Sequence, residues 1–391
     1  MTERTRTILL ILATVVLTGF AVSVGALEVS IPDPGLNAAV REALQKPTGP
    51  LTEQDMLMLT NLSACCRGIT NVQGLEAARN LLDLSLDANS LPNFVLPSGL
   101  TNLTALNLAN NQLTNFALPD ASANLETLNL FNNHLTSFVL SNAPPKLIAL
   151  DLGFNSLVQC ALPNGLTSLD TLFLEGNRLS NFTLPAGLPA LTRLDLAANG
   201  LTQFTFPADM TNVIDVLLFA NQLTNVVFST NLNRLENLFL QFNHLGSVVL
   251  PAGLTHLDQL HLEDNQLTNL TLPPDLTTLT TLFLDGNPFD TFVLSEPLAA
   301  TNLADLVTSL RNQNVSVSTY PLTIQLVALR TLADEFQFAV DGPPGIYTVL
   351  ASTNLVDWSE LSVAINTLGF FRFSDTSSPL SPRKFYRARS P

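Results

Sequence analysis

The sequence predicts a repeat solenoid of α/β type, built from short parallel strands and followed by an all-β domain. Three observations predict this class. An asparagine returns every 22 residues across ten consecutive units. Leucines beside it alternate with period two, as in a strand that buries one face. After about residue 315 the period ends, and short runs typical of strands take its place.

The composition narrows the functional classes. Of 391 residues, 46% are hydrophobic and 13% are charged, with 32 acids against 17 bases. So much apolar content excludes global disorder. The acidic balance argues against a nucleic-acid-binding protein, which needs a basic surface. Only one apolar run approaches membrane length, so a polytopic membrane protein is excluded too.

Residues 1–26 read as an export signal. Arg4 and Arg6 form a basic start, Ile8 to Leu17 is apolar, and Val24-Gly25-Ala26 offers small residues for cleavage. We therefore expect a secreted or cell-surface protein with no membrane span after cleavage. The alternative is an uncleaved anchor formed by Ile8 to Ala26.

A helical cap is expected over residues 27–58. Leu36 to Leu44 has the apolar spacing of a short amphipathic helix, and a second helix starts with Thr52 as its N-cap and Asp55 in its first turn. The terminal coil of a solenoid exposes the edge of the core, so such a cap is needed.

The repeat itself occupies residues 59–314. Leu103-Thr-Ala-Leu-Asn-Leu-Ala-Asn-Asn-Gln-Leu113 matches Leu169-Asp-Thr-Leu-Phe-Leu-Glu-Gly-Asn-Arg-Leu179, giving LxxLxLxxNxL. This pattern resembles the leucine-rich repeat. The first coil, Leu59 to Ile69, keeps the register but has Arg67 where asparagine belongs. Leu303 to Leu310 has lost the asparagine, and we expect it to close the solenoid.

The asparagines are predicted to be structural. Each lies where the chain turns after the strand and can bond backbone groups of its own and the neighbouring coil, which buried turns require. This structural ladder consists of Asn89, Asn111, Asn133, Asn155, Asn177, Asn199, Asn221, Asn243, Asn265 and Asn287.

A second recurring segment follows each asparagine. It carries one inward residue, which should pack against the same residue of the neighbouring coils. Phenylalanine occupies this position in six coils, as Phe94, Phe116, Phe138, Phe182, Phe204 and Phe292. Cys160, Val226, Val248 and Leu270 fill the others.

The three cysteines do not form a disulfide framework. Cys160 is predicted to be a core filler, too far along the solenoid to pair with Cys65. For the adjacent Cys65 and Cys66 we expect free thiols in a partly buried coil. A strained bridge between neighbours and intermolecular bonds are the alternatives.

Taken together, the cap and the 22-residue repeats resemble bacterial secreted leucine-rich-repeat proteins of the internalin type. The resemblance implies a horseshoe with a parallel sheet on its concave side and a mostly irregular, short-stranded convex side. It also implies that the outward strand positions form one continuous concave surface.

Residues 315–391 are predicted to form a small β-sandwich-like module. Strands are expected at Thr323–Arg330, Glu335–Val340, Ile346–Ser352, Phe370–Ser374 and Lys384–Ala388. The segments Tyr347 to Trp358 and Arg383 to Arg387 resemble a module that closes many secreted bacterial proteins. Its basic residues Arg383, Lys384, Arg387 and Arg389 could hold an anionic surface, or they could be solvated charges on an edge strand.

The expected concave surface has two columns of outward residues. The central column is Ser85, Asn107, Asn129, Asp151, Phe173, Asp195, Leu217, Phe239, His261 and Phe283. Two residues further on, the second column is Asp87, Ala109, Phe131, Gly153, Glu175, Ala197, Phe219, Gln241, Glu263 and Asp285. Large apolar side chains that face outward are the informative feature, and they lie among acids in the later repeats.

The candidate ligand-binding residues are therefore Phe173, Glu175, Asp195, Leu217, Phe219, Phe239, His261, Glu263, Phe283 and Asp285. Aromatic anchors beside acids suit a protein or peptide ligand with basic residues. The sequence holds no metal-ligand spacing, phosphate loop or nucleophile motif, so we expect no enzymatic activity, metal or cofactor. The alternatives are a self-associating structural component and, less favoured, a hydrolase that uses His261, Glu263 and Asp285.

Overall fold

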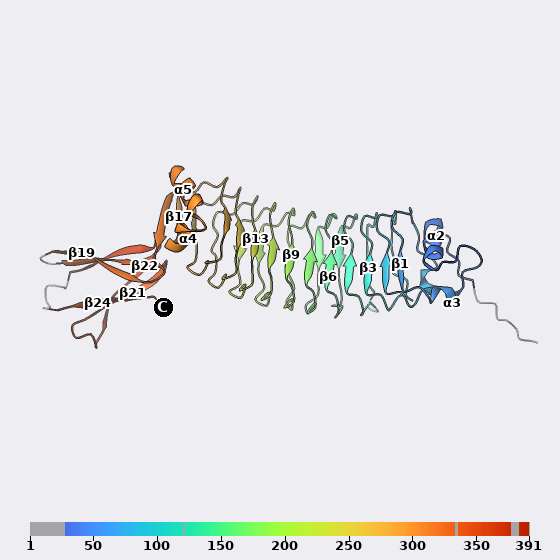
Figure 1. The fold of residues 1–391 in the computed structure, drawn as a ribbon, viewed down its shortest axis with the longest axis horizontal. Coiled ribbons are helices and arrows are strands. Elements are labelled where there is room, and N and C mark those ends of the chain that lie inside the picture. Colours follow the sequence, from blue (N-terminus) through green and yellow to red (C-terminus); the bar gives the residue numbers. More distant parts are fainter. Residues whose placement is uncertain (1–27, 120–121, 333–334, 377–382, 391) are drawn as a thin grey trace, which may run out of the picture.

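The computed structural model describes residues 28–119, 122–332, 335–376 and 383–390. The predicted signal segment, residues 1–26, lies outside these ranges. The chain forms a long, gently curved solenoid with a helical cap at one end and a separate β module at the other (Figure 1). The fold class predicted from the repeat is confirmed, and helices occur in the described solenoid only towards its two ends.

The amino-terminal cap contains the two expected helices. Helix α2 (Pro34–Ala43) begins at Asp33, whose carboxylate accepts a hydrogen bond from the Leu36 amide at 3.0 Å. Helix α3 (Glu53–Met56) has a capping box between Thr52 and Asp55. A short 3-10 turn, η1 (Leu75–Ala77), follows in the first connection.

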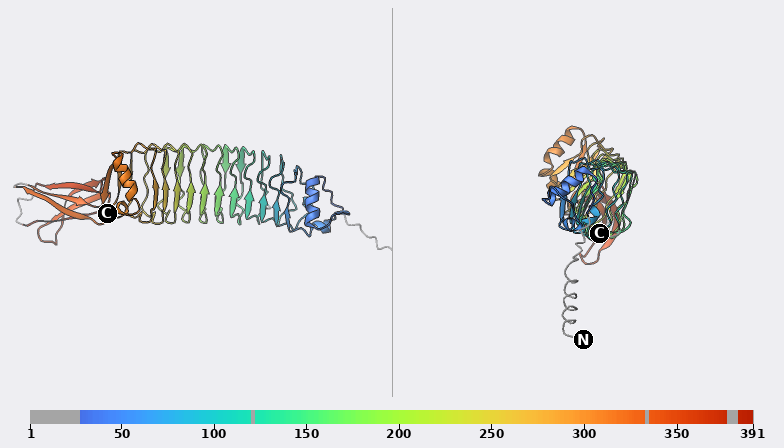
Figure 2. Two further views of the ribbon diagram at one scale, coloured as in Figure 1. Left: turned by 45° about the horizontal axis from the view of Figure 1, so that its top comes forward. Right: turned by 90° about the vertical axis from the view of Figure 1, so that its right-hand side faces the viewer.

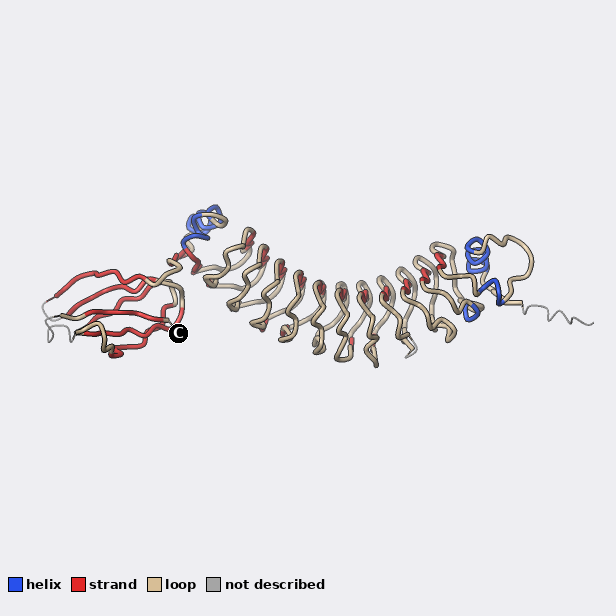
Figure 3. The backbone as a smooth tube through the Cα atoms, turned by 60° about the horizontal axis from the view of Figure 1, so that its bottom comes forward, coloured by secondary structure: helices blue, strands red, loops and turns tan. Residues whose placement is uncertain are grey.

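One parallel sheet of eleven three-residue strands runs along the solenoid. Figure 3 shows that these strands line the inner side of the arc. In each strand the middle residue is buried and its neighbours face outward, as the alternation predicts. The strands are β1 (Asn61–Ser63), β2 (Asp83–Ser85), β3 (Ala105–Asn107), β4 (Thr127–Asn129), β6 (Ala149–Asp151), β8 (Thr171–Phe173), β9 (Arg193–Asp195), β11 (Asp215–Leu217), β13 (Asn237–Phe239), β14 (Gln259–His261) and β16 (Thr281–Phe283).

The convex side has only short, interrupted strands. They pair as β5–β7, β10–β12 and β15–β17–β18, and the coils between them are irregular. Their bounds are β5 (Ser137–Val139), β7 (Gln159–Ala161), β10 (Gln203–Thr205), β12 (Asn225–Val227), β15 (Asn269–Thr271), β17 (Thr291–Ser295) and β18 (Ser316–Tyr320).

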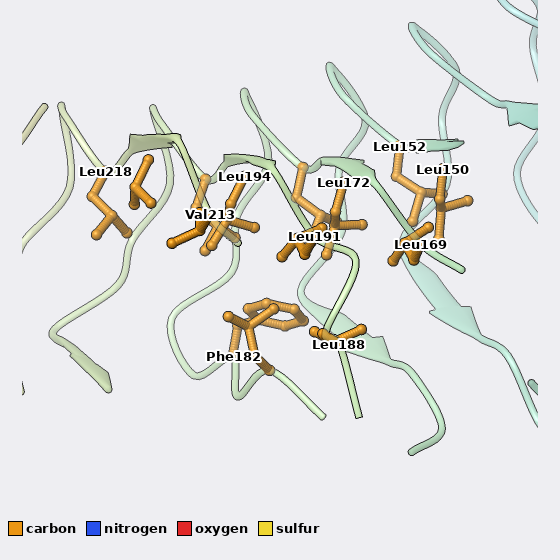
Figure 4. Packing of buried hydrophobic residues seen from close by; sticks show 14 of the residues in the cluster. Leu150, Leu152, Leu169, Leu172, Phe182, Leu188, Leu191, Leu194, Val213 and Leu218 are labelled. Carbon is orange, nitrogen blue, oxygen red and sulfur yellow. The ribbon is translucent and has the colours of Figure 1, made fainter. Parts of the chain in front are cut away.

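Leucine and phenylalanine fill the interior between the two sides. Each coil contributes its strand leucines and the inward residue of the recurring segment after the ladder asparagine. Side chains of successive coils therefore stack in rows (Figure 4). Phe94 and Phe116 stack with ring centroids 6.3 Å apart. Cys160 and Val226 are partly buried in the same row, and burial raises the pKa of the Cys160 thiol to about 12. Figure 2 shows the successive coils stacked side by side along the solenoid.

The asparagine ladder makes the bonds that a buried turn needs. In a typical coil, the Asn155 amide nitrogen donates to the carbonyls of Leu130, Leu152 and Gly153 at 3.0–3.2 Å. Its Oδ1 accepts from the Leu135 amide at 3.0 Å. One side chain therefore satisfies its own turn and ties it to the preceding coil.

The residue before each ladder asparagine has a left-handed backbone. Ala198, for example, has φ 52° and Phe154 has φ 51°. Glycine holds this position in two coils, as Gly176 and Gly286. A left-handed residue with a Cβ is strained, so the ladder must hold these turns against a local cost.

The first coil differs from the sequence-based expectation. Cys65 and Cys66 are bonded to each other, so the prediction of free thiols is wrong. Cys66 occupies the left-handed turn position, with φ 63°. Arg67, which replaces the ladder asparagine, forms an ion pair with Glu42 of helix α2 and so joins the coil to the cap.

The carboxyl end of the solenoid is closed by helices α4 (Glu296–Ala300) and α5 (Ala304–Asn312). The chain then adds β18, which pairs in parallel with β17. Tyr320 at its end is fully buried and donates to the Leu272 carbonyl at 2.6 Å. The expected boundary between residues 314 and 315 thus falls before a strand that is hydrogen-bonded to the solenoid.

The remaining residues form two antiparallel sheets of three strands each, β19–β20–β23 and β22–β21–β24. Between them lies a small core that includes Phe338, Val340, Tyr347 and Val349. The strands are β19 (Gln325–Leu332), β20 (Glu335–Asp341), β21 (Gly345–Ser352), β22 (Ser359–Asn366), β23 (Phe370–Asp375) and β24 (Phe385–Arg389).

Strand β22 was not among the predicted strands. It is an edge strand whose apolar residues Val363 and Ile365 are 56% and 70% exposed. Because these apolar side chains face solvent, the sequence lacks the pattern of a strand that turns its apolar side to the core.

We predict that Asn155→Ala destabilises the solenoid by about 3 kcal/mol, because it leaves buried backbone groups of two coils without partners. Urea unfolding followed by circular dichroism measures the change. Asn115→Ala, on the exposed convex side, is the matched control. A loss no greater than that of the control would contradict a structural role for the ladder.

We predict that Ala198→Gly stabilises the protein by about 1 kcal/mol, because glycine relieves the left-handed strain. Ala105→Gly, in strand β3, should instead destabilise it by about 0.5 to 1 kcal/mol. The two melting temperatures should move in opposite directions. Equal destabilisation by both variants would show that the turn is not strained.

Candidate functional site

The concave surface is built from the outward residues of the eleven-stranded sheet. Register is in phase along it, so residues 22 apart lie side by side on neighbouring strands, for example Asp151, Phe173 and Asp195. All ten candidate residues are partly or fully exposed and alternate with buried core positions. They therefore lie on the concave side, and six of them belong to the two zones described below.

The first zone, which we call the aromatic stripe, consists of Phe239, His261 and Phe283. The His261 ring lies between the two others, with centroid distances of 4.6 Å to Phe239 and 4.8 Å to Phe283. His261 Nδ1 is 3.2 Å from Glu263 Oε1, which orients the imidazole. Phe283 is 43% exposed and ends the stripe. Phe239 and His261 are partly buried, and together the three rings on consecutive strands offer an apolar contact surface to a ligand.

The second zone, which we call the acidic zone, consists of Asp151, Glu175 and Asp195 around Phe173. Burial raises the pKa of all three carboxyls, and in Glu175 the pKa reaches about 7, with the neighbouring charges of Asp195 and Asp151 adding to the shift. Backbone amides partly offset burial for the two aspartates, since Gly153 donates to Asp151 at 3.0 Å and Ala197 to Asp195 at 2.9 Å.

The position of the Glu175 side chain depends on a glycine. Its carboxylate lies against Gly153 of the preceding coil, where any Cβ would collide with it. Oε2 of Glu175 is buried and has no hydrogen-bond partner among the described residues. A cationic group that reached this carboxylate would supply the missing partner and remove the cost of ionising it.

The aromatic ring of Phe173 is partly engaged already. The guanidinium of Arg193 lies 5.6 Å from its centroid, in cation–π contact. Leu217 and Phe219 lie on the next coil and join the acidic zone to the aromatic stripe. The candidate surface is thus continuous from Asp151 to Phe283.

Sequence reasoning missed two further features. Phe154 and Phe242 are 53% and 55% exposed and occupy left-handed positions at the rim of the concave surface. These positions belong to neither of the two columns of outward residues. Phe154 meets Phe131 edge-on at 5.2 Å. A hollow of about 490 Å³ also lies over the concave strands β2, β3, β4, β6 and β8, lined by Asn107, Asn129, Asp151 and Phe173 among others. The regular 22-residue step could have identified the rim column.

The geometry does not support a metal centre at His261, Glu263 and Asp285. His261 and Glu263 are in contact, but Asp285 is an exposed residue of the next coil. Within the described ranges, no three histidine, cysteine or acidic side chains come close enough to hold a metal ion. Nor does any helix in those ranges have the length and apolar content to cross a bilayer.

Comparisons with known proteins agree with this architecture. A family model described as a BspA-type leucine-rich repeat region matches residues 85–193 and 176–288, with six copies of the repeat. No curated protein matches the chain.

Solved structures with the same repeat also match. YopM, a leucine-rich effector protein from Yersinia pestis, is 24% identical over 65% of this chain and 71% of its own, with a TM-score of 0.51. The internalin InlF from Listeria monocytogenes is 23% identical over 68% of this chain and 94% of its own, with a TM-score of 0.45. InlP from the same species is 20% identical over 80% and 91%, with a TM-score of 0.43.

We predict that Glu175→Gln stabilises the protein at pH 8 by about 1 to 2 kcal/mol, after allowance for partial exposure. The folded state holds the Glu175 proton more tightly than the unfolded chain, so its contribution to stability is present at low pH and is lost as the pH rises through about 7. The difference between variant and wild type should therefore vanish near pH 4.5.

Urea unfolding from pH 4.5 to 8 measures this difference, and Glu236→Gln, at an exposed position, is the control. A difference that stays constant over this range would show that Glu175 is not perturbed by its surroundings.

Proposed function

The chain belongs to the BspA-type leucine-rich repeat family, and on that premise we propose that it is an exported binding protein without enzymatic activity. Its ligand is a protein or peptide segment held along the concave surface. Proteins with this fold generally bind other proteins, and the chemistry of the outward positions adds which kind of ligand suits this chain.

The aromatic stripe carries the proposal. Phe239, His261 and Phe283 place three rings side by side on consecutive strands of the concave sheet. Cross-strand stacking stabilises the sheet on its own, yet an aromatic residue left 43% exposed gains more when a ligand covers it. Aromatic anchors of this kind dominate the energetics of protein interfaces.

The acidic zone adds charge specificity. Asp151, Glu175 and Asp195 lie two to six coils from the aromatic stripe. At about 4.8 Å for each coil, the nearest pair, Asp195 and Phe239, is about 10 Å apart. An extended peptide spans that gap in about three residues, so a ligand with a lysine or arginine about three residues or more from a bulky apolar side chain engages both zones.

Export is supported by the amino-terminal segment. Arg4 and Arg6 precede an apolar run and a small-residue site at Ala26, the order typical of a secretory signal. We propose that the mature protein acts outside the cytoplasm or at the cell surface, where its ligand is a secreted or surface-exposed polypeptide.

We predict that a random peptide library selected on the protein from residue 27 onward yields sequences that combine a basic residue with a bulky apolar one. Fluorescence anisotropy of a selected peptide should show at least tenfold weaker binding to Phe239→Ala/Phe283→Ala, because each ring contributes about 1 kcal/mol or more. Binding should also weaken above 0.3 M salt, since charge pairs are screened.

Val95→Ala/Val249→Ala, two exposed positions on the convex side, is the matched control and should bind as wild type does. Equal binding by the stripe variant and the control would refute the concave proposal. Concentration-dependent association that is unchanged in the stripe variant would instead favour a structural, self-associating component.

A further inference from the structure

The outer face of the β22–β21–β24 sheet is apolar and basic, and the concave surface plays no part in it. Pairing places Ile346 opposite Ile365 and Thr348 opposite both Val363 and Arg389. Leu350, on the same side of β21, is itself buried and lies between Arg387 on β24 and the exposed Glu360 on β22. We call Ile346, Val363, Ile365, Phe385, Arg387 and Arg389 the basic sheet face.

This face is open to solvent. Ile346, Val363 and Ile365 are 52%, 56% and 70% exposed, and Arg387 and Arg389 are exposed beside them. Lys384 points to the other side of β24 and pairs with Asp375 at 2.6 Å, so it contributes nothing here. Isolated exposed aliphatic residues are ordinary, but several on adjacent strands mark an interaction surface.

The loop that joins β21 to β22 extends the apolar surface. At its tip, Leu355 and Val356 are 56% and 78% exposed. The loop is held by its own side chains. Ser352 Oγ accepts from the amides of Asn354 and Leu355, and Asn354 Oδ1 accepts from those of Val356 and Asp357. Four consecutive tip amides are therefore satisfied without solvent.

The tip lies at the end of the module that is remote from the solenoid. Gly369, in the turn before β23, packs against Tyr320 at the end of the solenoid, and Gly342 lies near Ile324. Strand β21 starts from that end and carries the chain about 26 Å away over its eight residues. Figure 1 shows the module projecting from the solenoid.

Trp358 completes the surface at the base of the loop. It is the only tryptophan in the chain. The Arg387 guanidinium lies 5.3 Å from its ring centroid, and its indole Nε1 donates to the Leu355 carbonyl at 3.2 Å. Tryptophan and arginine beside aliphatic side chains are the residues that favour the interface between lipid headgroups and acyl chains.

We propose that the Leu355–Val356 loop and the basic sheet face dock the protein onto a lipid bilayer with anionic headgroups. Leu355 and Val356 enter the apolar boundary, and Arg387 and Arg389 contact the headgroups. Charge supports this choice, because residues 27–310 carry 8 bases and 25 acids (−17) whereas residues 311–391 carry 7 and 6 (+1). The acidic solenoid is thus repelled by an anionic surface, and the module is the part that can approach it.

The hydrogen bonding of the loop allows its tip to enter an apolar medium. Moving an unsatisfied amide into an apolar medium is costly, and the tip exposes four amides that are already paired. A second copy of the chain, with its acidic concave surface, is the competing occupant, and the experiment below distinguishes it. This inference does not rest on the proposed peptide-binding function.

The single tryptophan makes the test direct, since Trp358 fluorescence reports on this face alone. The protein from residue 27 onward is titrated with vesicles of phosphatidylglycerol and phosphatidylcholine, and separately with phosphatidylcholine vesicles. We expect a blue shift and quenching by brominated acyl chains with the anionic vesicles only. Added 0.5 M salt should weaken the binding.

Leu355→Ser/Val356→Ser should abolish quenching by brominated lipid, and Arg389→Gln should weaken partitioning about fivefold, the effect of one basic residue near the surface. Val95→Ser/Val249→Ser removes two equally exposed valines from the convex side and should change nothing. Near-ultraviolet circular dichroism checks that each variant is folded.

The proposal is overturned if wild type shows no response to anionic vesicles, or if the loop variant binds them as well as the convex control. It is also overturned if light scattering without vesicles shows association that the loop variant abolishes, because the occupant is then a second copy. Loss of vesicle binding would leave peptide binding by the concave surface untouched.

Discussion

The solenoid depends on one repeated interaction, the bonding of a buried asparagine amide to the backbone of two coils. The turn after a concave strand exposes its left-handed residue but buries carbonyls and amides on its inner side, where they cannot reach water. The Asn155 side chain serves four of them and joins its coil to the preceding one. Because this bonding outweighs the strain of the left-handed residue before it, alanine and even phenylalanine are accepted there.

The recurring features were predictable from the sequence, and so were the capping helices, which carry local signals of their own. Period and alternation give the concave sheet and its outward columns, and apolar spacing with an N-cap residue gives the helices. The bond between Cys65 and Cys66 and the exposed strand β22 belong to the ends, where no second copy reveals a pattern. The raised pKa of Glu175 was also hidden, since it arises from burial and from the charges of Asp195 and Asp151 on neighbouring coils.

The solenoid explains how a chain that is 46% hydrophobic and only 13% charged presents a polar surface to solvent. The outward positions of convex strands β5, β7, β10, β12 and β15 are occupied by serine, valine, glutamine, alanine, threonine and asparagine. Mostly uncharged polar side chains therefore contact solvent on that side, where acidic residues are not required. Three of them surround Phe173 on the concave side, where burial already opposes their ionisation.

This distribution of charge separates two surfaces within one chain. An acidic concave surface attracts basic polypeptides and is repelled by anionic membranes, because long-range charge acts before any contact forms. The β module carries exposed aliphatic residues and exposed arginines, whose charge is opposite to that of the concave surface. It projects beyond the last coil. The proposed tethering through the module uses none of the residues of the concave surface, so the two surfaces can be occupied at once. The net charges of −17 for residues 27–310 and +1 for residues 311–391 thus fit the two proposed binding surfaces, one for basic polypeptides and one for anionic lipid.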